Sequence, residues 1–237
     1  MNTLIRNPHG EKIDYTYHPS DGGKRLVILG HGVTGNKDRP FVVALAEALS
    51  KAGHPALRFS FSGNGASEGR FVDSTISKGV ADLGAVLDAT GGDVCYIGHS
   101  MGGATGVIRA SQDDRITRLI SLAGMVDTRG FAEREFGMVT PGEGCMWDEP
   151  DCPLSQAYMD DLRGIDSVLD KAPLIRVPWL LVHGTEDDVV PIEDSRRIFA
   201  QANEPKTLVE LPGANHVFGG EATGPMIEAV LGWLNQR

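Results

Sequence analysis

The sequence has little of several features that define particular protein classes. It holds three cysteines in 237 residues, a small and odd number that does not build a disulfide framework. No run approaches the roughly 20 apolar residues that a membrane-spanning helix needs. Residues 1–8 lack the charged stretch followed by an apolar one that is typical of a secretory signal. We therefore expect a cytoplasmic protein that does not bind membranes.

Basic residues are also scarce relative to acidic ones. The chain has 22 Lys and Arg against 32 Asp and Glu, a formal net charge of −10 at pH 7. Such a chain repels nucleic acid and anionic membrane surfaces, so neither is expected as a partner. No group of His, Cys and carboxylate residues has the spacing of metal ligands, and the glycine-rich turn at 30–35 carries no nucleotide-binding fingerprint. We expect no metal, no cofactor, and a monomer or homodimer that binds a small molecule.

The three cysteines have different expected roles. Cys95 lies in the apolar run 94–97 and is predicted to be a small buried hydrophobic residue. Cys145 and Cys152 flank Trp147 in an irregular stretch, and both a disulfide between them and two free thiols remain open from the sequence.

Aliphatic and β-branched runs alternate with amphipathic helical patterns along most of the chain. This alternation is typical of a parallel sheet covered by helices on both faces. We predict an α/β fold with a mostly parallel sheet of about eight strands, made of about six parallel strands and an N-terminal hairpin over residues 3–17. The expected parallel strands span residues 25–30, 55–61, 93–98, 118–123, 177–183 and 206–211. Helices are expected to begin at Pro40, near Ile76, after Ser100 and near Ala222.

One stretch interrupts the alternation. From Met125 to about Val177 the chain is acidic, punctuated by Pro and Gly, and rich in Met and aromatic residues. An irregular segment of this length inside a compact domain usually serves a function. We predict a single domain over residues 1–237, with residues 125–177 inserted as a lid after the 118–123 strand.

The segment Gly98-His99-Ser100-Met101-Gly102 matches the pattern G-x-S-x-G between an expected strand and an expected helix. In this context the serine occupies a strained turn that requires small neighbours and exposes its hydroxyl. The helix amino terminus also favours negative charge at a reacting carbonyl. Ser100 is therefore the predicted nucleophile.

A serine hydroxyl needs a base to take its proton. His216 follows the last expected strand and precedes the C-terminal helix, where a loop can reach over the serine turn, so we predict it as the base. The orienting acid is expected in the loop after the 177–183 strand. Three carboxylates compete there, Glu186, Asp187 and Asp188, and their chemistry alone does not separate them.

Two backbone N–H groups are expected to stabilise the oxyanion. The turn at 30–35 follows the first parallel strand, and its position suits Val33 as a donor, with Thr34 as the alternative. Met101, directly after the nucleophile, is the expected second donor. Thr34 and Trp147 are candidate substrate contacts.

Four segments together resemble the α/β-hydrolase family: 31–35 (HGVTG), 59–69 (FSFSGNGASEG), 98–103 (GHSMGG), and 183–191 (HGTEDDVVP) with the later GANH at 213–216. They span nearly the whole chain in the family's order. The second segment and the modest lid are similar to small bacterial feruloyl (cinnamoyl) esterases and serine aminopeptidase-like hydrolases. The resemblance implies an α/β-hydrolase fold and, through the spacing H-G-x-x-D-x-x-V-P, selects Asp187 over Asp188 as the acid.

The second segment departs from the family's usual F-D-F-[RN]-G-H-G. Ser60, Ser62 and Asn64 stand where that pattern has its acidic residue, its Arg or Asn, and its His. This puts substrate preference in doubt, because the loop borders the site in the family. The resemblance implies a serine carboxylesterase acting on small or aromatic acyl esters. The same three residues also suit an amidase, peptidase, thioesterase or lactonase, and a non-catalytic binding protein of this fold is a third alternative.

Overall fold

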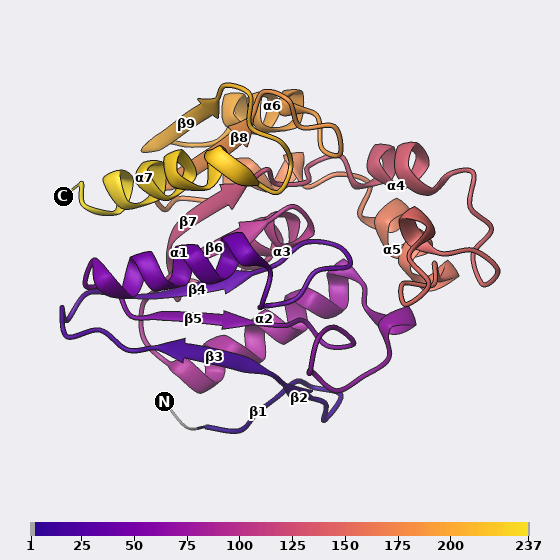
Figure 1. The fold of residues 1–237 in the computed structure, drawn as a ribbon, viewed down its shortest axis with the longest axis horizontal. Helices are drawn as coiled ribbons and strands as arrows, with labels where there is room; N and C mark the ends of the chain where they lie inside the picture. Colours follow the sequence, from indigo (N-terminus) through magenta and orange to yellow (C-terminus); the bar gives the residue numbers. More distant parts are fainter. Residues whose placement is uncertain (1–2, 237) are drawn as a thin grey trace.

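The structure is a computed structural model that describes residues 3–236. Its centre is a seven-stranded sheet of order β3-β5-β4-β6-β7-β8-β9 (Figure 1). The strands are β3 (Tyr15–His18), β4 (Leu26–Gly30), β5 (Ala56–Phe59), β6 (Val94–His99), β7 (Ile116–Leu122), β8 (Trp179–Gly184) and β9 (Lys206–Leu211). From β5 to β9 neighbouring strands pair in parallel, whereas β3 pairs antiparallel with β5 at one edge. The predicted mostly parallel sheet is confirmed.

The N-terminal segment differs from the predicted simple hairpin. A separate pair of short strands, β1 (Ile5–Arg6) and β2 (Lys12–Ile13), precedes the main sheet, so seven strands rather than eight form that sheet. The change of partner occurs at Asp14. Its N–H donates to Ser67 Oγ at 2.8 Å and its carbonyl accepts the N–H of Ser60 at 2.9 Å. These bonds turn the chain onto the edge of β5.

Strand alternation divides the core into two layers. Along β4, Val27 and Leu29 belong to one buried cluster, and Ile28 belongs to the other. Helices α1 (Pro40–Lys51) and α7 (Thr223–Leu234) cover the first face. Helices α2 (Ile76–Thr90), α3 (Met101–Ala110) and α6 (Ile192–Gln201) cover the second face. Cys95 is buried on the first face, as predicted.

The segment at 125–177 contains two helices that its composition did not predict, α4 (Thr128–Phe136) and α5 (Gln156–Ile165). Both have polar caps, because Asp127 accepts the N–H of Gly130 and Ser155 accepts that of Tyr158. Figure 1 shows these helices beyond the carboxyl ends of the parallel strands. The aromatic and methionine residues of the segment are largely buried: Phe131, Phe136, Met146, Tyr158 and Met159. Cys145 and Cys152 are free thiols.

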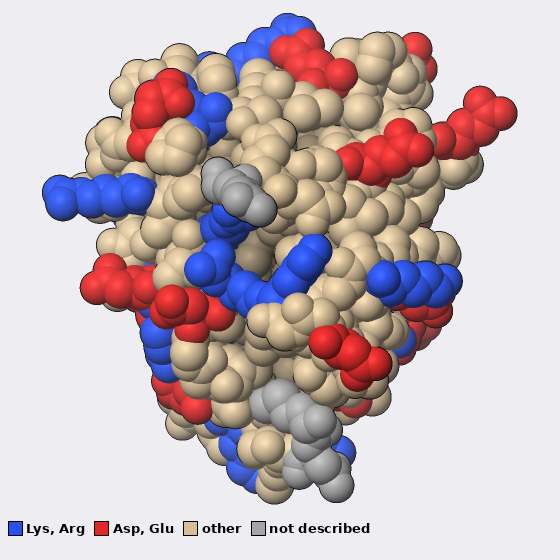
Figure 2. Space-filling view, turned by 90° about the vertical axis from the view of Figure 1, so that its left-hand side faces the viewer, with Lys and Arg blue, Asp and Glu red and all other residues tan. Residues whose placement is uncertain are grey.

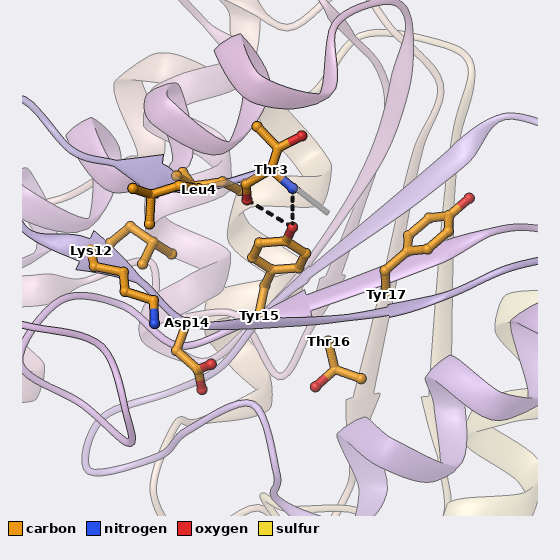
Figure 3. A pocket seen from close by; sticks show the side chains of 9 residues that line it. Thr3, Leu4, Lys12, Asp14, Tyr15, Thr16 and Tyr17 are labelled. Atoms are coloured by element: carbon orange, nitrogen blue, oxygen red, sulfur yellow. Dashed lines mark hydrogen bonds between the residues drawn. The ribbon is translucent and has the colours of Figure 1, made fainter. Parts of the chain in front are cut away.

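Two hollows lie away from the carboxyl ends of the strands. At the opposite end of the sheet, a hollow of about 350 Å³ includes Lys24, Arg25 and Arg118 in its lining, and Figure 2 shows basic side chains around a hollow on that face. A second hollow of about 630 Å³ follows edge strand β3. In Figure 3 the Tyr15 hydroxyl closes part of it by bonding to the backbone of Thr3 (3.0 and 2.8 Å). Neither hollow includes Ser100 in its lining.

Candidate active site

Ser100 lies at the turn between β6 and α3, at the carboxyl edge of the sheet. Its φ of 52° and ψ of −116° place a non-glycine residue in a strained region that costs about 1–3 kcal/mol. Neighbouring backbone groups hold it there. Its N–H donates to the carbonyl of Leu122 at 3.0 Å, and its carbonyl accepts the N–H groups of Gly103 (2.8 Å) and Met125 (3.1 Å). The side chain makes no cap to α3, which leaves the hydroxyl for other partners.

Two glycines permit this turn by allowing close approach. A Cβ on Gly98 would lie 2.1 Å from the carbonyl oxygen of Gly102, so β6 and the first turn of α3 pack together only without that side chain. A Cβ on Gly32 would lie 3.0 Å from Ser100 Cβ and 2.9 Å from His99 Nδ1. The glycine-rich turn after β4 therefore lies directly against the serine turn.

His216 and Asp187 come together from two loops at the same edge. His216 Nδ1 donates to Asp187 Oδ2 at 2.8 Å. Asp187 Oδ1 accepts the N–H groups of Val189 and Val190 at 2.9 and 2.8 Å. Burial acts to raise the pKa of Asp187, but the hydrogen bonds from His183 and His216 outweigh it and lower that pKa well below its usual range. The structure thus places an ionised Asp187 beside His216 and leaves Asp188 exposed.

His99 supports His216 from the other side, a role that the sequence did not indicate. Its Nε2 donates to the carbonyl oxygen of His216 at 2.9 Å, and the two rings lie 4.7 Å apart. The ring of Phe41 packs against His99 at 4.8 Å. Burial lowers the pKa of His99 to about 3, so this imidazole is neutral and acts as a fixed N–H donor.

His31 shapes the turn that contains Val33 and Thr34. Its Nδ1 donates to the carbonyl of Gly32 at 2.8 Å, and its Nε2 accepts the N–H of Phe61 at 3.0 Å. The N–H of Gly35 donates back to the carbonyl of Gly32 at 3.1 Å, which closes a turn. Thr34 occupies its strained position, with φ 53°. This local network fixes the backbone of Val33 beside the serine turn.

A cavity of about 290 Å³ opens at this edge. Three predicted site residues, Ser100, His216 and Val33, line it, together with the proposed contacts Thr34 and Trp147. The remaining lining residues are His31, Gly32, Gly35, Arg39, Phe41, His99, Glu149, Val189 and Val217. Met101 and Asp187 do not line it. The Met101 side chain is buried in the core, whereas its N–H belongs to the first turn of α3, where helix N–H groups have no intrahelical partner.

Trp147 reaches the cavity from the inserted segment. It adopts φ 48° and ψ 36°, another strained position. Its ring packs against Phe136 at 4.9 Å, and its Nε1 donates to Glu135 Oε2 at 3.0 Å. The side chain is therefore held in place while remaining 39% exposed. Trp147, a candidate contact from the sequence, thus lines the same cavity as Ser100.

The three departures in the second family segment lie outside the cavity lining. Ser62 Oγ donates to Asp82 Oδ2 at 2.7 Å, and Asn64 Nδ2 donates to Ser74 Oγ at 2.8 Å. Ser60 Oγ accepts the N–H of Lys37 at 3.1 Å. All three are buried and hydrogen-bonded. Their direct effect is on the packing of the loop rather than on a ligand.

Acid is expected to destabilise the protein through His31. Burial lowers the pKa of its imidazole to about 4, whereas an unfolded histidine titrates near 6.5. Between these values the unfolded chain binds the proton and the folded protein does not, so the free energy of unfolding falls as the pH falls. Urea unfolding at about pH 7 and about pH 5 measures this slope. We expect a shallower slope for His31→Gln.

A matched control is His9→Gln, because His9 is exposed on the N-terminal turn. It should leave the slope as it is. Equal slopes for the unchanged protein and His31→Gln would contradict the prediction.

Sequence comparison identifies the family. A sequence model of the alpha/beta hydrolase fold matches residues 25–143, and one of serine aminopeptidases matches residues 152–223. The chain belongs to the alpha/beta hydrolase fold family. Ser100, Asp187 and His216 follow one another along the chain in the order in which that fold usually carries its serine, acid and histidine.

Among solved structures, Est1E from Butyrivibrio proteoclasticus with bound ferulic acid superposes with a TM-score of 0.86. It is 26% identical, and the match covers 98% of both chains. The uncharacterized protein Rv2307c of Mycobacterium tuberculosis is 29% identical over 210 residues, 85% of this chain and 66% of that protein. The chain thus spans just under two thirds of that relative's length. Human mitochondrial palmitoyl-protein thioesterase ABHD10 is 26% identical over 66% of this chain and 55% of its own.

None of the helices within residues 3–236 is long and apolar enough to cross a membrane. The same residues contain no group of three or more His, Cys, Asp or Glu side chains arranged to hold a metal ion.

Proposed function

We propose that this protein is a serine carboxylesterase in which Ser100, His216 and Asp187 form the catalytic triad. The observation that carries the proposal is the cavity that a strained Ser100 and a carboxylate-bound His216 both line. Membership of the alpha/beta hydrolase family supports it. Among structural relatives, Est1E binds an aromatic carboxylic acid, the product type of such a reaction.

The reaction begins with attack of Ser100 Oγ on the ester carbonyl carbon while His216 Nε2 takes the hydroxyl proton. The carbonyl π bond opens to an oxyanion, which the N–H groups of Met101 and Val33 stabilise. The tetrahedral intermediate collapses, His216 protonates the departing alkoxide, and an acyl-enzyme remains. Water then attacks the acyl group by the same route, which releases the acid and restores Ser100.

Asp187 makes His216 an effective base. With Nδ1–H bound to a carboxylate, the Nε2 lone pair is free to face the serine, and the imidazolium formed on proton transfer is stabilised. The low pKa of Asp187 keeps the carboxylate charged through this step. His99 holds the His216 backbone, and so fixes the ring from a second direction.

The cavity suits a small or aromatic acyl group. Its volume of about 290 Å³ is at the lower end of the range for ligand sites. Apolar side chains of Phe41, Trp147, Val189 and Val217 supply much of its lining. An aromatic ring beside Trp147 gains stacking and burial, which supports a feruloyl esterase-like preference.

A panel of substrates tests the reaction class. We expect hydrolysis of p-nitrophenyl acetate and butyrate and of methyl ferulate, with lower activity on aminoacyl amides. A matched butyryl thioester separates ester from thioester preference. A fluorophosphonate probe, which reacts only with an activated serine, should label Ser100. No hydrolysis on the whole panel together with no labelling would refute the proposal.

Removing the Trp147 ring should selectively affect substrates with an aromatic acyl group. Trp147→Ala is expected to lower kcat/KM for methyl ferulate by about tenfold or more, since one lost apolar contact surface changes discrimination by roughly 10- to 200-fold. Activity on p-nitrophenyl acetate should change by less than about threefold, because an acetyl group offers little apolar surface for the Trp147 ring to contact. Steady-state kinetics on both esters measure the ratio of the two changes in kcat/KM.

The control for this variant is Met138→Ala. Met138 is fully exposed on the same inserted segment and does not line the cavity. It should leave both rates unchanged. Equal losses on both esters in Trp147→Ala would contradict a role in acyl selection.

A further inference from the structure

His183 is a fully buried histidine at the end of β8, four residues before Asp187. Its Nε2 lies 2.9 Å from the carbonyl oxygen of Val190 and 3.1 Å from Asp187 Oδ2. Both neighbours are acceptors, so Nε2 carries a hydrogen and donates it. Its Nδ1 lies 2.7 Å from Ser195 Oγ on α6. In the neutral ring this nitrogen accepts the Ser195 hydroxyl, which fixes a single tautomer.

Asp187 Oδ2 consequently has an imidazole N–H on each of two sides. His216 Nδ1 lies 2.8 Å away, and His183 Nε2 lies 3.1 Å away. The other oxygen, Oδ1, is held by the N–H groups of Val189 and Val190. The carboxylate side chain is fully buried, so these donors replace water around its charge. His183 is the one side-chain donor among them that does not line the cavity.

We propose that His183 is a positioning residue that, together with Ser195, holds the Asp187 carboxylate in the orientation His216 requires. It touches no substrate. Its Nε2–H group donates to the Val190 carbonyl at 2.9 Å and faces Asp187 Oδ2 at 3.1 Å as a second, longer contact, so the loop from β8 to α6 closes around the acid. The inference rests on the proposed function, because it assigns Asp187 the part of the triad acid.

The other carboxylates near His183 are each paired with an arginine. On β9, Glu210 is the register neighbour of His183, and it pairs with Arg196 at 2.8 Å. On α6, Asp194 pairs with Arg197 at 2.7 Å. The remaining titratable groups near Asp187 are His216 and the neutral His99. Asp187 is thus the carboxylate that the His183 N–H group faces.

His183→Leu tests the role. Without the second N–H, the carboxylate is less well oriented, and we expect kcat for p-nitrophenyl butyrate to fall roughly tenfold to hundredfold. KM should stay within about twofold, because the residue lies outside the cavity. In this variant the Asp187 carboxylate also loses one of its N–H donors. Its negative charge is then less neutralised and stabilises the His216 imidazolium more strongly than in the unchanged protein. The acid limb of the kcat/KM profile should therefore move to higher pH.

A rescue variant separates positioning from folding. In His183→Gln the amide nitrogen reaches about as far as Nε2, so it should restore most of kcat and return the acid limb towards its original position. Ser195→Ala should lower kcat in the unchanged protein but have no further effect in the His183→Leu background, since the two residues act as a unit. Ile198→Ala, at an α6 residue buried in the hydrophobic core, controls for lost stability. It should lower the free energy of unfolding without moving the pH profile.

The rate of fluorophosphonate labelling at Ser100 distinguishes this inference from the proposed function. If the unchanged protein is labelled and His183→Leu is labelled more slowly, with a shifted acid limb, the inference stands. If His183→Leu is labelled and turns over at the original rate, the inference is wrong while the proposed function survives. A loss of kcat with an unmoved acid limb and no rescue by glutamine also overturns it. An unlabelled, inactive wild-type protein overturns both.

Discussion

Replacing Ser100 with alanine is expected to abolish ester hydrolysis while leaving the fold intact. The hydroxyl is the atom that bonds to the substrate, so kcat should fall by roughly 10⁴-fold or more, to the level supported by oxyanion stabilisation and binding alone. Binding of ferulic acid should persist, because the cavity is unchanged. Stopped assays with high protein concentration measure the residual rate, and calorimetry measures the binding.

The Ser100→Ala variant should also be at least as stable as the unchanged protein. Ser100 at φ 52° is strained whichever small side chain it carries, and its side chain caps no helix. The matched serine control is Ser111→Ala, at the opposite end of α3 from Ser100. It should retain full activity. Retained hydrolysis in Ser100→Ala would contradict the assignment of Ser100 as the nucleophile.

Asp187→Asn is the second change with a large expected effect. The amide keeps the shape of the side chain but removes its charge, and its NH₂ group can occupy the position that faces His216 Nδ1. His216 would then present a hydrogen rather than a lone pair to Ser100. A change of this kind in a serine triad lowers kcat by about 10⁴-fold. Raising the pH should recover part of the loss, because hydroxide can replace the enzyme's base.

Asp188→Asn is the control for this prediction. Asp188 is exposed in the same loop and is the alternative acid that the sequence left open. We expect its substitution to change kcat by less than about twofold, as for surface positions in general. A larger loss in Asp188→Asn than in Asp187→Asn would reverse the assignment of the acid.

The sequence was sufficient to predict the parallel sheet and the strained turn at Ser100. Aliphatic runs predicted six parallel strands, and the glycines around Ser100 predicted its strained turn, because both signals are local. Gly98 is required by a backbone contact only four residues away, at Gly102. Asp187 was separated from Asp188 only by family spacing. In the structure that choice depends on which carboxylate the loop turns inward.

Other features depend on contacts between distant segments, and sequence reasoning missed them. The bond from His99 to the carbonyl of His216 joins residues 117 positions apart. The helices at 128–136 and 156–165 were not predicted, because Gly and Pro around them suggested an irregular lid. Capping by Asp127 and Ser155 was the available signal. His183 stands at the end of an expected strand, and its contact with Asp187 is visible only in three dimensions.

Detection of an acyl group on Ser100 is the most direct test of the proposed mechanism. The protein is mixed with p-nitrophenyl butyrate, quenched in acid within the first turnovers, and digested for mass spectrometry. We predict one butyryl group on the peptide that contains Ser100, and none on the corresponding peptide of Ser100→Ala. Turnover of the ester with no acyl group on Ser100, or with the group on another residue, would contradict the mechanism.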